Sequence, residues 1–278
     1  MKSLVFFISV LFSCISLSQE VKKEYYDNGQ LKRLDHYNAN GKRIGESIMY
    51  YENGQLHVIG KFENDYKVGE WRTYYETGEL EEIIDYATGE AKTYYKSGQL
   101  KEIGNHENYE LNGMYKIFYE SGELKEEGQY KDGKLNGAIK VYYKNGQLYQ
   151  IAYRKNGLIS GERRTYYENG HLQEINNYEN GQQSGESKQF FETGELHKIF
   201  YYENGKLHGE AKTYYKNGQL HEIGSYENAN RIGVWKLFYE NGQTYYISNF
   251  KNGFSQVNLK VITKTGNCDK YQTIYRVS

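Results

Sequence analysis

The chain has 278 residues, of which 26% are charged and 38% hydrophobic, and its formal net charge is −1. Nucleic-acid binders normally carry a clear basic excess, so this balance argues against nucleic-acid binding. The chain also contains 32 tyrosines, 30 glycines and no proline. Abundant aromatic residues argue against disorder, and tyrosine-rich strands with glycine turns favour an all-β fold.

The first residues differ from the rest of the chain. Residues 1–18, MKSLVFFISVLFSCISLS, combine one lysine, a short apolar run and a small-residue end. This pattern predicts a secretory signal peptide cleaved before Gln19, and therefore export to the periplasm, the cell envelope or the medium. One alternative is an uncleaved anchor. Another is a lipoprotein signal ending at Cys14, although Phe12 is bulky for that motif.

Cysteine usage is consistent with simple export. If Cys14 leaves with the signal peptide, Cys268 is the last remaining thiol and no internal disulfide can form. The chain has no CxxC pair and no cysteine cluster for zinc. The folded state must therefore be stabilised by the β-structure itself.

Residues 19–253 repeat a unit of about 24 residues. A turn glycine follows each aromatic pair at Gly29, Gly54, Gly78, Gly98, Gly122, Gly146, Gly170, Gly194, Gly218 and Gly242. A second glycine precedes nine of these by nine residues, at Gly45, Gly69, Gly89, Gly113, Gly137, Gly161, Gly185, Gly209 and Gly233.

Each unit reads as a β-hairpin. In residues 50–60, YYENGQLHVIG, the Asn-Gly pair separates two strand-like runs, which is a strong hairpin signal because both residues tolerate positive φ. We predict an all-β, elongated, solenoid-like array of about ten antiparallel hairpins that form one twisted meander sheet, with residues 254–278 as a C-terminal capping hairpin. The turn glycines Gly78 and Gly98 are only 20 residues apart. We expect the missing residues to come from the loop at residues 86–89, with both flanking strands intact.

Alternation along the strands predicts two different faces. The third residue after the second glycine is basic in every unit except at Ile48, and it shares a side with the first aromatic of each pair. The second aromatic lies on the opposite side, with residues such as Trp71 and Ile117, and we expect it to be buried. After each turn, leucine and isoleucine recur three residues apart, so a bulge is needed. Gly60, Gly104, Gly128 and Gly224 could supply it, and its position stays open.

The cycle GEWRTYYETGEL, residues 69–80, resembles the MORN repeat, and is most similar to the bacterial variant often grouped with antitoxin-repeat proteins. The resemblance covers roughly residues 24–253. It implies stacked antiparallel hairpins without catalytic residues, and functions in protein scaffolding or oligomerisation. Some eukaryotic members also contact phospholipids, but this chain has no basic excess and no strong membrane-lipid signal.

Candidate chemistry is sparse. His57, His197 and His221 occupy equivalent positions, but neighbouring repeats lie roughly 10 Å apart, too far to share one ion directly. Acidic residues recur in every repeat, whereas an active site is normally singular. We therefore predict no catalytic residues, no metal site, no cofactor and no enzymatic activity, with an enzyme site in the irregular C-terminal segment as the remaining alternative.

The candidate binding face is the row of first aromatics. Tyrosine offers a large contact area at low rotamer entropy, although the rings and lysine stems could instead cover one another. The favoured interpretation is a non-catalytic exported scaffold for protein–protein interaction. The alternatives are a cell-envelope glycan- or peptide-binding module and an exported immunity- or antitoxin-like protein, and homo-oligomerisation stays open. The row consists of Tyr50, Tyr74, Tyr94, Phe118, Tyr142, Tyr166, Phe190, Tyr214 and Phe238.

Overall fold

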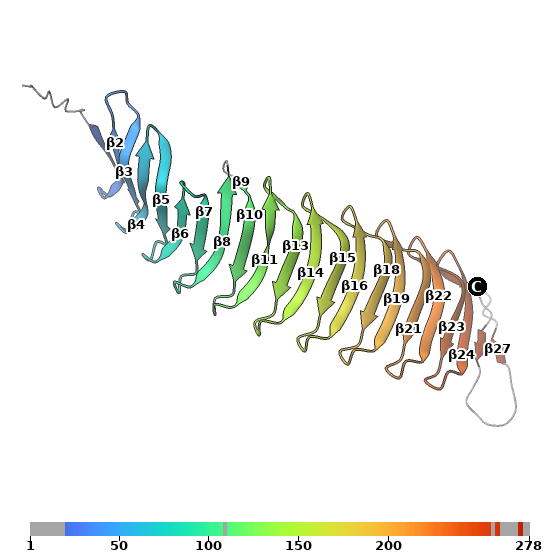
Figure 1. The fold of residues 1–278 in the computed structure, drawn as a ribbon. Helices are drawn as coiled ribbons and strands as arrows, with labels where there is room; N and C mark the ends of the chain where they lie inside the picture. Colours follow the sequence, from blue (N-terminus) through green and yellow to red (C-terminus); the bar gives the residue numbers. More distant parts are fainter. Residues whose placement is uncertain (1–19, 108–109, 257–258, 262–271, 275–278) are drawn as a thin grey trace, which may run out of the picture. The chain divides into compact units, whose positions relative to one another are not determined.

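The computed structural model describes residues 20–107, 110–256, 259–261 and 272–274, which form 27 β-strands and no helix (Figure 1). The predicted signal peptide and both cysteines lie outside the described residues. The chain divides into two compact units, residues 1–98 and 99–278.

Consecutive strands pair antiparallel in the first unit, so the chain runs as a meander. Its strands are β1 Glu20–Tyr25, β2 Leu31–Tyr37, β3 Arg43–Tyr50, β4 Leu56–Glu63, β5 Tyr66–Tyr74, β6 Leu80–Asp85 and β7 Glu90–Tyr94.

The second unit continues the same pattern, although one arm of several hairpins is interrupted for a single residue, as at Asn112 between β9 and β10. The prediction of an all-β array of antiparallel hairpins is confirmed. The strands are β8 Leu100–Glu107, β9 Glu110–Leu111, β10 Gly113–Phe118, β11 Leu124–Lys131, β12 Lys134–Leu135, β13 Gly137–Tyr142, β14 Leu148–Lys155, β15 Leu158–Tyr166, β16 Leu172–Glu179, β17 Gln182–Gln183, β18 Gly185–Phe190, β19 Leu196–Glu203, β20 Lys206–Leu207, β21 Gly209–Tyr214, β22 Leu220–Glu227, β23 Asn230–Phe238, β24 Thr244–Lys251, β25 Phe254–Gln256, β26 Leu259–Val261 and β27 Gln272–Ile274.

The segment after the repeats is described only in part. Strand β25 pairs antiparallel with β24, and β26 pairs with β27 in a separate two-stranded sheet. The remaining residues of the predicted capping segment lie outside the described ranges. The boundaries at residues 18 and 253 and the capping role stay predictions.

Each repeat has two kinds of turn. In the turn after the aromatic pair, the Tyr51 amide donates to the Gln55 carbonyl at 2.8 Å, and the Asn53 side chain accepts the Gln55 amide at 2.9 Å. Only the glycine of this turn, Gly54, has positive φ, at 85°. The two-residue turn with two positive φ values lies at the opposite end, for example at Asn156 and Gly157, with 52° and 83°. The predicted Asn-Gly geometry therefore belongs to the second turn.

The predicted bulge lies immediately after the first turn. In the hairpin of β3 and β4, Met49 faces Val58 while Tyr50 faces Leu56, so His57 has no partner. The same register shift leaves Lys32, Glu81, Lys125, Tyr149, Gln173, His197 and His221 unpaired in their hairpins. Gly60 and Gly224 lie instead at a second irregularity, where the register shifts between neighbouring hairpins.

A buried row crosses the middle of the strands in each unit and is called the central row here. It contains Ser47, Trp71, Ala91, Tyr115, Ile139, Ala152, Asn176, Ser187, Ala211, Trp235 and Ser248, each at most 8% exposed. The ring of Trp235 lies over Gly224, where an added Cβ would approach the ring to 2.1 Å. Trp71 lies over Gly60 in the same way. A large side chain on one strand thus packs over a glycine on the neighbouring strand, which leaves no cavity between the two strands.

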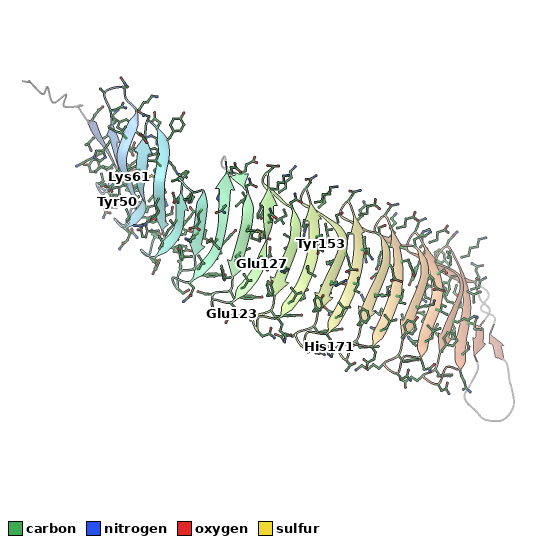
Figure 2. The ribbon with its side chains drawn as sticks, in the orientation of Figure 1. Tyr50, Lys61, Glu123, Glu127, Tyr153 and His171 are labelled. Atoms are coloured by element: carbon green, nitrogen blue, oxygen red, sulfur yellow. The ribbon has the colours of Figure 1, made fainter. Side chains whose placement is uncertain are left out.

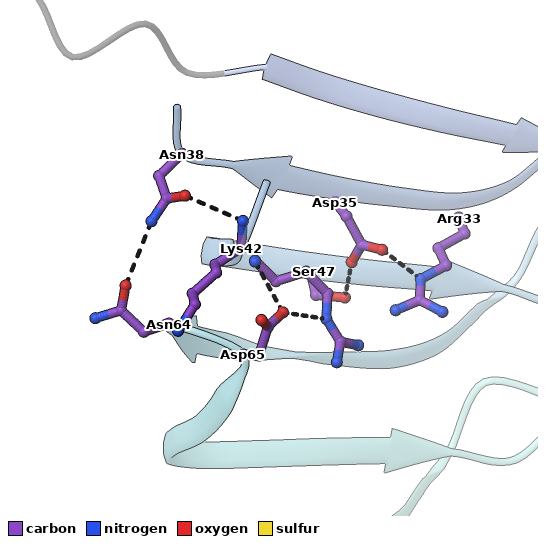
Figure 3. A network of polar contacts seen from close by, with 8 residues as sticks. Arg33, Asp35, Asn38, Lys42, Ser47, Asn64 and Asp65 are labelled. Carbon is purple, nitrogen blue, oxygen red and sulfur yellow. Dashed lines mark hydrogen bonds and ion pairs between the residues drawn. The ribbon is translucent and has the colours of Figure 1, made fainter. Parts of the chain in front are cut away.

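The first unit begins its central row with a polar cluster (Figure 3). Asp35 is 4% exposed, accepts a hydrogen bond from the Ser47 hydroxyl at 2.5 Å and pairs with Nε of Arg33 at 2.6 Å. A buried carboxylate is tolerated only with such partners. At the neighbouring turn, Asp65 accepts from both the amide and Nε of Arg43 at 3.0 and 3.3 Å.

The second aromatics connect successive repeats. The hydroxyl of Tyr143 donates to the backbone carbonyl of Tyr166 at 2.7 Å, one repeat later in the chain. These residues are half-buried, so the expectation that they are the buried row is wrong, because that row lies four residues earlier. We call the set with this hydrogen bond, at 2.7–2.8 Å in every case, the bridging tyrosines: Tyr26, Tyr51, Tyr75, Tyr119, Tyr143, Tyr167 and Tyr215.

The opposite ends of the hairpins are connected by backbone atoms. The Gly157 amide donates to the Leu135 carbonyl at 2.8 Å, and the Gly181 amide donates to the Ile159 carbonyl at 2.9 Å. Equivalent bonds join the turns at Asp65, Gly133, Gly205, Ala229 and Gly253 to the preceding hairpin. Within each unit, repeats that have a bridging tyrosine are therefore held to their neighbours at the aromatic turns, and the backbone bonds act at the opposite ends of the hairpins.

The short repeat loses residues from strands as well as from its turn. Strand β6 has six residues, where β4 and β8 have eight, so the expectation of intact strands is wrong. Asp85 closes the remaining tight turn by accepting the Ala87 amide at 2.8 Å and the Thr88 hydroxyl at 3.0 Å. The bridging hydrogen bond from Tyr75 to the Tyr94 carbonyl is retained at 2.8 Å.

The bridging hydrogen bond should stabilise the fold, which can be tested by removing a hydroxyl at one bridging position and adding one at another. Tyr143→Phe should lower the free energy of unfolding by about 1 kcal/mol, because a neutral hydrogen bond contributes about 0.5–1.5 kcal/mol. Phe191 occupies the same position without a hydroxyl, so Phe191→Tyr should raise stability by a similar amount. Urea titration followed by circular dichroism measures both. Tyr149→Phe is the control, and equal effects for all three variants would contradict the prediction.

The ring of Trp235 lies so close to Gly224 that any larger residue at position 224 should destabilise the fold. Gly224→Ala should destabilise the protein by about 1–3 kcal/mol, because the new methyl group would overlap the Trp235 ring. Gly104→Ala is the matched control, since its Cβ would lie 3.5 Å from the nearest atom, Cβ of Tyr115. Thermal unfolding of both variants tests this, and equal midpoints would show that the ring does not require a glycine beneath it.

Candidate binding face

The structure places the nine predicted aromatics at equivalent positions. Tyr50, labelled in Figure 2, lies opposite Leu56 at the strand end that leads into an aromatic turn. Tyr142 and Tyr214 lie opposite Leu148 and Leu220 in the same way. All nine are half-buried, and a leucine that lies opposite the ring, such as Leu56 opposite Tyr50, shields part of it. We call these nine residues the aromatic row and the side of the strands that carries them the charged face.

The structure adds residues to this face. Tyr25 is equivalent to the row members, faces Leu31 and is 57% exposed. Tyr153 and Tyr201 also lie on the charged face and are 51% and 38% exposed. Sequence reasoning missed both, although each lies two residues after an isoleucine of the charged face, and strand alternation could have identified them.

A basic residue lies two positions before the aromatic residue of the row in most of the hairpins. Arg72, Arg164 and Lys188 lie opposite isoleucines across the hairpin. Each also pairs with the glutamate two residues earlier in its own strand, at 2.5 Å. Lys92 pairs with Glu90 and Lys212 with Glu210 in the same way. The aliphatic parts of these arginine and lysine side chains thus lie opposite isoleucine. Their positive charges are neutralised by the glutamates of the same strand.

Tyr142 has an additional polar partner. Its hydroxyl donates to Oε1 of Glu127 at 2.8 Å, and Nζ of Lys140 lies 3.4 Å from the same oxygen. Burial, followed by the Glu127 contact, raises the pKa of Tyr142 to about 12. The Tyr142 hydrogen bond lowers the pKa of Glu127, burial opposes this shift, and Lys140 adds to it. Both groups therefore keep fixed protonation states near neutral pH.

A shallow groove of about 400 Å³ opens on the charged face of the first unit. Its lining combines Ile59 and Gly60 with the charged side chains of Lys61, Glu70 and Arg72. This mixture of an apolar floor and charges of both signs suits a polypeptide better than a strongly charged small ligand.

The histidines considered as ligands lie on the other face, each at a bulge. His197 stacks on Phe191 and His57 lies tilted against Tyr51, both with ring centroids 4.2 Å apart, and the ring centroids of His221 and Tyr215 are 4.6 Å apart. In the part of the chain that the structure describes, no group of three or more His, Cys, Asp and Glu residues is arranged to hold a metal ion. Among the same residues, none belongs to a helix that is long and apolar enough to cross a membrane.

The repeat geometry agrees with a known family. The model described as the MORN repeat variant matches residues 21–39, 43–64, 67–88, 87–108, 111–132, 135–156, 159–180, 183–204, 197–211, 207–228 and 231–252. The chain belongs to the MORN repeat variant family. This confirms the resemblance seen in the sequence and makes the protein a repeat scaffold of hairpin units.

Comparisons with individual proteins add little to the family assignment. No curated protein matches this MORN repeat protein. It is similar to a chain in "Crystal Structure of TcdB2-TccC3-Cdc42", at 12% identity and TM-score 0.20, over 87% of this chain and 14% of that one. It is also similar to a porin-like protein from Bacteroides uniformis ATCC 8492, at 8% identity and TM-score 0.16, over 86% and 93% of the two chains. At these scores neither likeness bears on fold or function.

The Tyr142–Glu127 contact predicts a pH effect. A carboxyl whose pKa is lower in the folded state stabilises the protein above its unfolded pKa of about 4.3, and that contribution is lost as the pH falls through the folded value. Tyr142→Phe should therefore raise the pKa of Glu127 and reduce the loss of stability below about pH 4.3. Carboxyl-resolved NMR titration measures the shift, with Tyr153→Phe as the control. An unchanged Glu127 pKa would contradict this account.

Proposed function

We propose that this MORN repeat protein is an exported, non-catalytic scaffold that binds a partner protein along the aromatic row. The observation that carries the proposal is the regular placement of nine half-buried rings beside a ladder of paired charges. Repetition of one surface element along many units suits an extended partner, because small contributions from successive repeats add.

The chemistry of the charged face supports a polypeptide partner. Half-buried tyrosines offer contact area and a hydroxyl while losing little rotamer freedom on binding. The neighbouring pairs of a basic residue and a glutamate place opposite charges side by side, so the face attracts neither a polyanion nor a polycation as a whole. Exposed tyrosines such as Tyr153 extend the contact area on the same side.

The other parts of the proposal have different support. Residues 1–18 support export by their sequence pattern alone. A non-catalytic role is supported by the regular pairing of the charged residues, since Arg72, Arg164 and Lys188 each neutralise a carboxylate in their own strand. No group in this ladder is set apart as an acid, base or nucleophile would be.

The test replaces three rings of the row. Tyr74→Ala, Tyr142→Ala and Tyr214→Ala in one variant should abolish capture of the envelope proteins that the wild type retains, measured by quantitative mass spectrometry of pull-downs. Far-ultraviolet circular dichroism and the thermal midpoint should show that the array remains folded.

The matched control removes three large side chains that follow the two-residue turns. Tyr66, Leu158 and Phe254 occupy equivalent positions and are 53–75% exposed, so their alanine variant should capture the same proteins as the wild type. Equal capture by both variants would refute the proposal. Binding to a glycan array that depends on the row would favour the glycan alternative, and a single captured toxin would favour the immunity-like one.

A further inference from the structure

The central row of the second unit contains a polar cluster around Asn176. Asn176 is 1% exposed, and its Oδ1 accepts hydrogen bonds from the Ser187 hydroxyl and from Nε2 of Gln183, both at 2.7 Å. Arg163 lies opposite Asn176, at the row position that Tyr115 and Ile139 occupy in earlier repeats. Buried polar groups are costly unless they are satisfied, so this cluster requires an explanation that the repeat pattern alone does not supply.

Arg163 extends from this cluster into an open groove of about 290 Å³. Its guanidinium donates to Oε2 of Glu174 at 3.0 Å, and Gln189 donates to Oε1 of the same carboxylate at 3.0 Å. Nε of Arg163 is buried and has no hydrogen-bond partner in the described part of the chain. The groove therefore has a floor of planar polar side chains.

Aromatic rings line the same groove on the face that carries the bridging tyrosines. Tyr149, at a bulge, is 37% exposed and lies edge-to-face against Tyr143 at 5.1 Å. Tyr167 is held by its hydrogen bond to the Phe190 carbonyl, and His197 by its stacking on Phe191. Burial, followed by Lys198 and His221, lowers the pKa of His197, so the imidazole is mainly uncharged at pH 7.

The composition of the groove limits the chemistry of a ligand. The one guanidinium and the one carboxylate neutralise each other, which disfavours both anions and cations. The amide and hydroxyl groups disfavour an apolar ligand, and the volume is at the lower end of the range for small-molecule sites, about 300–1,000 Å³. Planar hydrogen-bonding groups beneath aromatic rings suit a flat, neutral molecule with several hydroxyl groups.

We propose that this groove binds a neutral saccharide, with Arg163, Glu174 and Gln189 hydrogen-bonded to sugar hydroxyls and Tyr149 against the apolar face of the ring. Arg163, Glu174 and Gln189 do not belong to the aromatic row, and of that row only Phe190 borders the groove. The proposal therefore does not depend on Tyr74, Tyr142 or Tyr214, which the test of the protein-binding proposal removes.

The repeats provide an internal comparison. One repeat earlier, Ile139 takes the place of Arg163, so the floor lacks the guanidinium. One repeat later, Ser187 replaces Arg163, and Lys198 replaces Glu174. Among the described repeats, no other one combines this arginine, carboxylate and amide. The groove is therefore singular, in contrast to the periodic charged face.

The test uses the full chain and a defined panel of probes: glucose, galactose, mannose, N-acetylglucosamine and their β1,4-linked disaccharides. Saturation-transfer NMR identifies binding, and isothermal titration calorimetry measures affinity. We expect at least one probe to bind, and Tyr149→Ala and Glu174→Gln each to weaken its binding at least tenfold. Absence of binding by every probe would overturn the proposal.

Two controls separate this site from the rest of the molecule. Tyr153→Ala removes an exposed ring from the same strand but from the charged face, and binding of the sugar should be unchanged. The triple variant of Tyr74, Tyr142 and Tyr214 should likewise retain sugar binding. Loss of sugar binding in that variant, with normal binding by Tyr149→Ala, would move the site to the aromatic row and overturn the assignment. Circular dichroism of each variant excludes unfolding as the cause.

Discussion

The hydrogen bond from each bridging tyrosine to a carbonyl of the next repeat sets the register of the array. A β-sheet without a covering layer can slip along its strands unless something specifies the alignment. The hydroxyl of Tyr143 reaches the Tyr166 carbonyl only when successive hairpins are aligned turn to turn. The short repeat shows this constraint, because its Tyr75 bridge has the same length although it spans 19 residues instead of the usual 23. The deleted residues come from the far end of the hairpin, where the bridge is unaffected.

The bulge and the central row follow from this alignment. Displacing His57 from the ladder lets its ring lie against Tyr51, which is the ring that makes the bridge. Toward the middle of the strands, the side chains of neighbouring strands must fill the space that a second layer would fill in a larger protein. Two pairs fill this space in different ways: the ring of Trp235 lies over Gly224, and Ile139 lies opposite Ala152. The central row therefore tolerates more varied residues from repeat to repeat than the bridging position, which is an aromatic residue throughout the described repeats.

Sequence reasoning reached the fold class, the two faces and the existence of a bulge. Alternation placed Tyr142 with Lys140 and away from Val141, and the structure agrees because both contact Glu127. The position of the bulge could not be derived, because a spacing of three between leucine and isoleucine permits it at either intervening residue. The buried row was also missed, since size complementarity depends on which residues face each other across strands. The polar groove was missed for the same reason: Arg163 and Asn176 are unremarkable in sequence and meaningful only as neighbours.

The two faces place different demands on a ligand. On the charged face, successive repeats offer nearly the same ring and several add the same ion pair, so affinity for a long partner would be a sum of small terms and would decline gradually as rings are removed. The groove beside Arg163 offers its groups once, and its polar floor rests on Asn176, which is fully buried and hydrogen-bonded. A site of this kind depends on each of its members, because removal of one leaves another buried polar group without a partner. The bridging hydrogen bonds align the hairpins beneath both surfaces. Because they do not involve Arg163 or Asn176, these two residues can differ from the repeat pattern while the hairpins stay aligned.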